Sequence, residues 1–190
     1  MTSALPSRLP DGVDVRALTL RADERGTLVE CFREAWPSVT RPVQWNVVRS
    51  EPRVLRGFHA HARHFDYLFM AAGRMDLGLR DIRASSPTFG LAARIEISAE
   101  SPTAVTLPPG VAHGFCFLER SIHVYAVSEY WDQNDELGCH WGDPAIGIDW
   151  PISDPTLSPR DRDAGTLAEM IRLYEARRVE AALGPLGEGR

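Results

Sequence analysis

The 190-residue chain has little of what marks membrane, secreted or nucleic-acid-binding proteins. No stretch approaches the roughly 20 apolar residues that a membrane span requires, and residues 1–15 contain no apolar segment typical of a secretory signal. The three cysteines are scattered and form no Cys-x-x-Cys pair, so they predict reduced thiols rather than a disulfide framework. The net charge is −5 and no basic block occurs, which argues against duplex nucleic acid as a partner. We therefore expect a cytoplasmic protein without a membrane or nucleic-acid partner.

Short apolar runs separated by turn residues fill about residues 15–130. Met75, Leu77 and Leu79 alternate with other residues, with the period of two that is typical of a strand. Many short strands at this spacing predict an all-β barrel or sandwich. The pattern changes at Thr166 and Glu169, which match a capping box. Apolar residues at helical spacing follow, so we expect a C-terminal helix over about 165–183 and a frayed tail after it.

Ionisable side chains gather just before one predicted strand. His59, His61, His64 and Asp66 lie within eight positions, and a further histidine, His113, follows the turn-forming Pro108–Gly110. In an extended segment His59 and His61 face the same way. The residues alone leave three interpretations open, namely a metal site, an acid/base site and a polar loop without chemistry.

The spacing of these residues resembles the two motifs of cupin proteins. A narrower resemblance rests on six motifs in order: DERGTLVECF, LRGFH, SSPTFG, LPPGVAHGF, DPAIGIDWP and LSPRDRD. These resemble the dTDP-4-dehydrorhamnose 3,5-epimerase family from about Arg21 to Asp163. The resemblance implies a single cupin domain over 1–190, with a double-stranded β-helix (jelly roll) at about 15–163 and the C-terminal helix packed on it.

The resemblance also implies an activity, the epimerisation of a nucleotide-linked 4-keto-6-deoxyhexose at C3, C5 or both. His59 would be the base that removes a sugar proton, Asp161 would orient it, and Tyr125 would be the opposing acid. Such an isomerase requires no cofactor, and the family implies a homodimer. Its substrate, a nucleotide-diphosphate sugar, would be contacted by Arg25, Glu30, Gln44, Asn46, Arg56, Asp66 and His113. Histidine suits this role because its pKa lies near working pH.

The chain departs from the family at Asp66, which takes the position of the lysine beside the sugar. An anion cannot stabilise an enolate directly. One hypothesis is that Fe, Mn, Ni, Zn or Co binds there instead and supplies the positive charge. The candidate ligands are His59, His61, Asp66 and His113. In that case His59 could not also be the free base.

Two other functions remain open from the sequence, a metal-dependent cupin isomerase or dioxygenase and a non-catalytic sugar-binding cupin. Several side chains also have a simpler interpretation. We expect His64 to face solvent, His123 and His140 to be structural or exposed, and Asp66 to be a possible ion-pair partner of Arg63 or Arg56.

Overall fold

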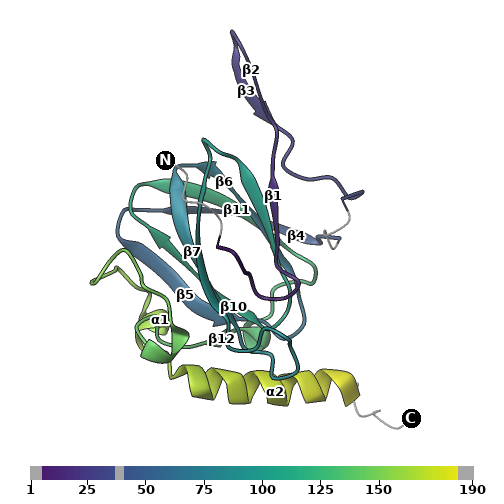
Figure 1. Cartoon of the computed structure of the whole chain (residues 1–190), viewed down its shortest axis with the longest axis vertical. Helices are drawn as coiled ribbons and strands as arrows, with labels where there is room; N and C mark the ends of the chain where they lie inside the picture. The colour runs from purple at the N-terminus through teal and green to yellow at the C-terminus, as the bar shows by residue number, and fades with distance from the viewer. Residues whose placement is uncertain (1–5, 37–40, 184–190) are drawn as a thin grey trace.

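Two five-stranded antiparallel sheets face each other in the computed structural model, which describes residues 6–36 and 41–183 (Figure 1). The first sheet has the order β1-β9-β6-β11-β4, and the second has the order β12-β5-β10-β7-β8. The first comprises β1 (Asp14–Ala17), β4 (Gln44–Ser50), β6 (Asp66–Ala72), β9 (Thr103–Leu107) and β11 (Ser121–Val127). The second comprises β5 (Val54–Ala60), β7 (Arg74–Asp81), β8 (Ala92–Ser98), β10 (Val111–Phe117) and β12 (Leu137–Gly138). The predicted all-β jelly roll is confirmed, whereas the tail expected to fray, 184–190, lies outside the described residues.

The alternation seen in the sequence builds the core between the sheets. Met75, Leu77 and Leu79 on β7 are at most 1 % exposed and pack with Leu68 of β6 and Val105 of β9. Both sheets thus contribute one apolar face, which is the arrangement that removes the most apolar surface from water.

The predicted C-terminal helix is α2 (Leu167–Leu183), and it lies across one end of the barrel (Figure 1). Its start is the expected capping box, since the Glu169 backbone N–H donates to Thr166 Oγ1 and the Thr166 N–H donates to Glu169 Oε2. Leu167, Met170 and Tyr174 are buried against a second apolar cluster. No helix in the described part of the chain has both the length and the apolar character needed to cross a membrane.

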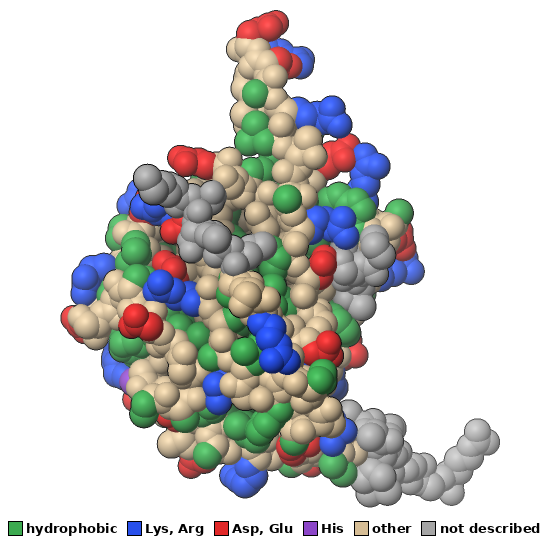
Figure 2. Space-filling view, viewed as in Figure 1, with side chains coloured by type: hydrophobic (Ala, Val, Ile, Leu, Met, Phe, Trp, Pro, Cys, Tyr) green, Lys and Arg blue, Asp and Glu red, His purple; other side chains and the backbone are tan. Residues whose placement is uncertain are grey.

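A hairpin of β2 (Leu20–Asp23) and β3 (Gly26–Val29) projects from the barrel (Figure 1). Figure 2 shows charged side chains at its tip and apolar ones along its length. Leu20 and Leu28 are 40 % and 59 % exposed, which is a large exposure for leucine. The hairpin therefore has apolar surface that the barrel of its own chain does not cover.

The sequence did not predict β4, nor the short helices η1 (Gln133–Asp135), η2 (Pro144–Ile146) and α1 (Pro159–Arg162). In β4 the apolar Trp45 and Val47 are exposed, whereas Gln44 and Asn46 are partly buried. This strand reverses the usual pattern of polar residues outside and apolar residues inside, which is why periodicity did not reveal it.

The motif SSPTFG forms a hydrogen-bonded loop around one buried carboxylate. Asp81 is completely buried and accepts bonds from Arg83 Nε at 2.9 Å, Ser86 Oγ at 2.6 Å and Thr88 Oγ1 at 2.6 Å. Burial acts to raise the pKa of Asp81, but these bonds outweigh it and lower the pKa to about 2. The motif is therefore structural, and it anchors the turn between β7 and β8.

We predict that Asp81→Asn lowers the free energy of unfolding at pH 7 by about 2 kcal/mol, because the pKa lies nearly two units below that of the unfolded chain. A depressed pKa stabilises the fold above about pH 4, and this contribution is lost as the pH falls towards 2. Urea denaturation at pH 7 and pH 3 measures both effects. Asp154→Asn is the control, since that side chain is 93 % exposed and its loss should change stability by less than about 0.5 kcal/mol. Equal losses in the two variants would contradict the prediction.

Candidate functional site

A cavity of about 260 Å³ lies within the barrel and is lined from both sheets. The side chains that line it include most of the predicted site residues, namely Arg56, His59, His61, Asp66, His113, Tyr125 and Asp161. Its size is just below the roughly 300–1,000 Å³ typical of small-molecule pockets. The cavity is therefore the candidate active site, and its residues come from segments far apart in the sequence.

His59 and Asp161 form a close pair in this cavity. His59 Nε2 lies 2.7 Å from Asp161 Oδ1, although the two residues are 102 positions apart. Asp161 is held in turn by its own backbone N–H, which donates to Ser158 Oγ, and by the Gly57 N–H, which donates to Asp161 Oδ2 at 3.4 Å. Burial acts to raise the pKa of Asp161, but the hydrogen bond and charge of His59, together with the bonds to Ser158 and Gly57, outweigh it and lower the pKa. The carboxylate thus stays ionised and fixes the imidazole so that Nδ1 is free to accept a proton.

Glycine is required at Gly57, next to this pair. Its φ of 121° disfavours L side chains, and a Cβ there would lie 2.8 Å from the Gly114 Cα and 2.9 Å from the His113 oxygen. The close approach brings β5 against β10, so His59 and His113 face each other as register partners. The glycine of the LRGFH motif therefore sets the geometry of the cavity wall.

Glu136 is a further cavity residue that the sequence did not predict. Its Oε1 lies 3.6 Å from His59 Nδ1, and its Oε2 accepts hydrogen bonds from Trp131 Nε1 at 2.5 Å and is 3.2 Å from an Arg160 nitrogen. His59 therefore lies between two carboxylates, Asp161 and Glu136. Glu136 belongs to the irregular segment 132–163, where no periodic pattern or motif marked it, and Trp131 lines the cavity as well.

Tyr125 enters the cavity from the opposite sheet. It lies on β11, where it pairs with Asn46 of β4 and Leu68 of β6. Burial is the main cause that raises the pKa of its phenol, and the negative charges of Asp66 and Glu136 act in the same direction. The hydroxyl therefore remains protonated near neutral pH and can serve as a proton donor.

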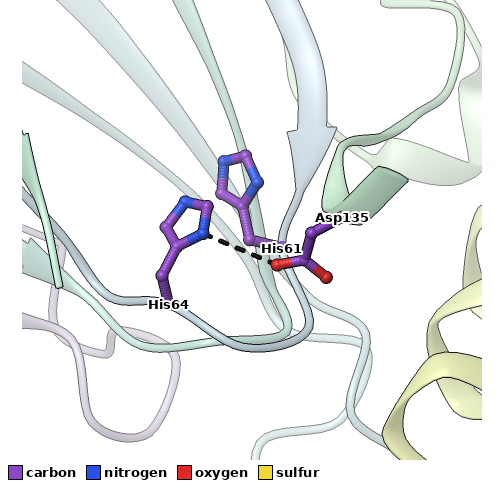
Figure 3. A group of neighbouring side chains, drawn as sticks. All are labelled: His61, His64 and Asp135. Carbon is purple, nitrogen blue, oxygen red and sulfur yellow. Dashed lines mark ion pairs between the residues drawn. The ribbon is translucent and has the colours of Figure 1, made fainter. Parts of the chain in front are cut away.

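Four ionisable residues meet deeper in the cavity. The Nε2 atoms of His61, His64 and His113 lie 3.7, 3.9 and 4.0 Å from the carboxylate oxygens of Asp66. The rings of His61 and His64 stack at 4.0 Å beside Asp135, whose Oδ2 lies 3.5 Å from His64 Nδ1 (Figure 3). The three histidines and Asp66 are each at most 7 % exposed. We call His61, His64, Asp66 and His113 the histidine cluster.

Burial is the largest single influence on the pKa of each residue in the histidine cluster. It raises the pKa of Asp66 to about 7, lowers that of His113 to about 4 and lowers that of His61 well below its usual value. Burial also acts to lower the pKa of His64, but the hydrogen bond with Asp135 and the charge of Asp66 raise it overall. His61 and His113 are therefore neutral near pH 7 and have a free lone pair.

Several predictions about this region are wrong. His64 is 3 % exposed rather than solvent-facing, because Asp135 and His61 pack against it. Asp66 pairs with histidines, whereas Arg63 pairs with Asp132 and Asp135 instead. Among the predicted metal ligands, His61, Asp66 and His113 have donor atoms within 4.8 Å of one another. His59 does not belong to that group, since its nitrogens face Asp161 and Glu136.

Besides Asp66 and His113, three predicted substrate contacts lie on or near the cavity wall. Arg56 lines the cavity, and its Nε donates to Ser50 Oγ at 3.1 Å. Gln44 and Asn46 are on β4 and share a face with the cavity-lining Val48. Gln44 Nε2 donates to Asn46 Oδ1, whereas the buried Asn46 Nδ2 has no hydrogen-bond partner within residues 6–36 and 41–183. The donor has almost no accessible surface, so a ligand reaches it only if the side chain turns towards the cavity.

Arg25 and Glu30 are placed elsewhere. Arg25 lies in the turn of the projecting hairpin, and Glu30 directly follows β3. Neither residue lines the cavity. Arg25 pairs with Asp23, and Glu30 pairs with Arg33. Within one chain they therefore do not complete the candidate site.

His123, expected to be structural or exposed, is 1 % exposed and lines the cavity. Its ring stacks between those of Phe117 and Tyr125, and burial lowers its pKa to about 4. It therefore supports the position of Tyr125 as a neutral aromatic ring.

Known proteins resemble the chain over most of its length. The family model described as dTDP-4-dehydrorhamnose 3,5-epimerase matches residues 8–169. The enzyme of that name from Shigella flexneri is 35 % identical over 148 residues, covering 73 % of this chain and 82 % of the relative. A dTDP-4-dehydrorhamnose 3-epimerase from Streptomyces niveus is 36 % identical over 158 residues, covering 78 % and 76 % of the two chains.

Solved structures agree with these matches. A 3'-monoepimerase from Streptomyces bikiniensis in complex with dTDP-quinovose superposes with a TM-score of 0.79 at 30 % identity, covering 90 % of this chain and 98 % of the other. The Legionella pneumophila 3,5-epimerase in complex with dTDP-4-keto-L-rhamnose gives a TM-score of 0.78 at 28 % identity, covering 98 % and 99 %. From its sequence and its fold alike, the chain belongs to the dTDP-4-dehydrorhamnose 3,5-epimerase family.

Proposed function

We propose that the chain epimerises a nucleotide-linked 4-keto-6-deoxyhexose at C3, C5 or both. The observation that carries this proposal is the His59–Asp161 pair, 2.7 Å apart, on one wall of a cavity that Tyr125 enters from the other sheet. Inverting a carbon requires a base on one face of the sugar and an acid on the other. The two sheets of the barrel supply one of each.

The reaction proceeds in two proton transfers. His59 Nδ1 takes the proton from the carbon next to the ketone, whose electrons move to the keto oxygen to form an enolate, and Asp161 stabilises the imidazolium that results. Tyr125 then donates its phenolic proton to the opposite face of the same carbon as the ketone reforms. The sugar changes configuration with no net gain or loss of atoms, and both residues regain their starting states by exchange with solvent.

The substrate is proposed to carry a dTDP group, because two structural relatives hold dTDP-linked sugars. The cavity of about 260 Å³ is proposed to hold the sugar, with the nucleotide outside it. Arg56 provides a guanidinium for the diphosphate, and the Asn46 amide provides a donor if its side chain turns towards the cavity. Because nucleotide sugars are intracellular metabolites and the three cysteines are free, a cytoplasmic location fits this substrate.

Solvent exchange tests the proposed function. The protein is incubated in D2O with a dTDP-4-keto-6-deoxyhexose, and NMR follows deuterium at C3 and C5 together with the configuration of each carbon. We expect deuterium at one or both positions, accompanied by inversion. A substrate that keeps all its protium after prolonged incubation at high enzyme concentration would exclude epimerisation and leave only sugar binding.

We further propose that the protein is a homodimer in which the projecting hairpin reaches the partner subunit. Val47 on the edge strand β4 is 66 % exposed, and Leu28 on the hairpin is 59 % exposed. An edge strand with exposed apolar residues favours pairing with another chain. This arrangement would also place Arg25 and Glu30 against the partner, where they can contact its substrate.

Val47→Glu should therefore dissociate the dimer and reduce epimerisation at least tenfold, because it puts a charge on the proposed interface. Light scattering after size exclusion measures the mass, and the exchange assay measures activity. The matched control is Val179→Glu, which puts the same charge on a side chain that is 51 % exposed. Val179 lies on α2 rather than on β4 or the hairpin. A wild-type protein that is monomeric at micromolar concentration and fully active would contradict the proposal.

A further inference from the structure

The histidine cluster contains buried polar atoms that the fold does not satisfy. The three separations between its imidazole Nε2 atoms and the Asp66 carboxylate, 3.7, 3.9 and 4.0 Å, all exceed the length of a hydrogen bond. In the part of the chain that the structure describes, His64 Nε2 and His61 Nδ1 are buried without a hydrogen-bond partner. Unsatisfied buried nitrogens are rare and destabilising, and none of the three imidazoles is within hydrogen-bond distance of the carboxylate that it faces, so the cluster indicates a missing ligand.

The spacing of the donor atoms fits a metal ion. Zinc binds imidazole nitrogen and carboxylate oxygen at about 2.0–2.2 Å, so donors on one ion lie roughly 3–3.5 Å apart. The donor atoms of His61, Asp66 and His113 lie within 4.8 Å of one another. Shifts of up to about 0.9 Å in each side chain therefore suffice to bring them to binding distance.

Two of the imidazoles are already oriented by contacts on their far side. His113 Nδ1 lies 3.1 Å from the Val111 carbonyl oxygen and donates to it, which leaves Nε2 as an acceptor facing Asp66. His64 Nδ1 faces Asp135 in the same way (Figure 3), whereas His61 Nδ1 has no such partner among the described residues. A carbonyl or carboxylate behind the imidazole is the usual support of a metal-binding histidine.

A second group, His61, His64 and Asp135, also has donor atoms within 4.8 Å. Asp135 is, however, already used, since its two oxygens accept the backbone N–H groups of Ala62 and Arg63 at 3.2 Å each. It does not line the cavity, whereas Asp66 does. The geometry therefore favours Asp66 as the anionic ligand.

We propose that His61, Asp66 and His113 bind one divalent transition-metal ion at the inner end of the cavity, with His64 beside it. Two imidazoles and one carboxylate suit Zn, Co, Ni, Mn or Fe. His59 is not a ligand, so it remains free to act as the base. If the proposed function holds, the ion supplies at the keto oxygen the positive charge that the family's lysine would supply at position 66.

Metal binding is tested without substrate. Protein stripped with a chelator is titrated with Co²⁺ and with Zn²⁺, using calorimetry for stoichiometry and affinity and the visible spectrum of bound cobalt for the ligand set. We expect one ion per chain with a dissociation constant in the micromolar range or below, and a cobalt spectrum of a nitrogen- and oxygen-ligated ion. Wild-type protein that binds no stoichiometric ion would overturn the proposal and would leave the epimerase assignment untouched.

Three variants and one control locate the site. Asp66→Asn and His61→Ala should weaken binding at least 100-fold, and Asp135→Asn should weaken it tenfold or less. The control, His140→Asn, changes a residue outside the cavity and should leave binding unchanged. Circular dichroism melts check that each variant is folded. A larger loss in Asp135→Asn than in Asp66→Asn, or full binding by folded His61→Ala, would show that this ligand set is wrong.

Discussion

His59→Asn will slow both inversion and deuterium incorporation by about 10²–10⁴-fold, which is the usual contribution of a general base. Asparagine keeps a polar group of similar size that can still contact Asp161, so the fold is retained. It has no lone pair basic enough to take a proton from carbon. The exchange assay in D2O measures the loss directly at the reacting carbon.

The matched control is His140→Asn. His140 is outside the cavity, and its Nδ1 accepts the Gly142 N–H, a bond that the asparagine oxygen can replace. This variant should keep wild-type exchange and inversion. If deuterium still enters undiminished in His59→Asn, then His59 is not the base, and Glu136 or a member of the histidine cluster must remove the proton.

Tyr125→Phe will separate the two proton transfers, and its expected effect on inversion is about 10²-fold or more. Without the phenol, no acid from the β11 wall serves the opposite face of the sugar. His59 still removes the proton and can return a deuteron to the face it came from. Deuterium incorporation with retained configuration should therefore fall less than tenfold, while inversion is nearly lost.

NMR of the recovered sugar measures incorporation and configuration in one sample. Tyr130→Phe is the control, since Tyr130 is 75 % exposed and does not line the cavity. Parallel losses of incorporation and inversion in Tyr125→Phe would mean that the phenol stabilises the enolate or the bound sugar. The assignment of Tyr125 as the opposing acid would then be wrong.

The sequence predicted the parts of the fold that depend on local pattern. The period-two alternation of Met75, Leu77 and Leu79 is the core face of β7, and the Thr166–Glu169 capping box begins α2. Motif resemblance predicted the family, the isomerase class and the pairing of His59 with Asp161 across 102 positions. Spacing within one chain segment could not have suggested that pair.

Contacts between distant segments account for what the sequence could not predict. His64 sits in a polar stretch that looks like a surface loop, and only the approach of Asp135, 71 residues later, buries it. Glu136 is one of several acids in an irregular segment, and nothing local distinguishes the one that reaches His59. The edge strand β4 exposes its apolar residues, so its pattern indicated no barrel strand.

The placement of base and acid on different sheets has a consequence for how this enzyme could diversify. The distance between the two reacting groups is set by the packing of the sheets against each other, through residues such as Leu77 and Val105 that do not line the cavity. Trimming or enlarging such side chains would alter stereochemical fidelity, and with it the ratio of singly to doubly inverted product, while both reacting groups stay chemically intact.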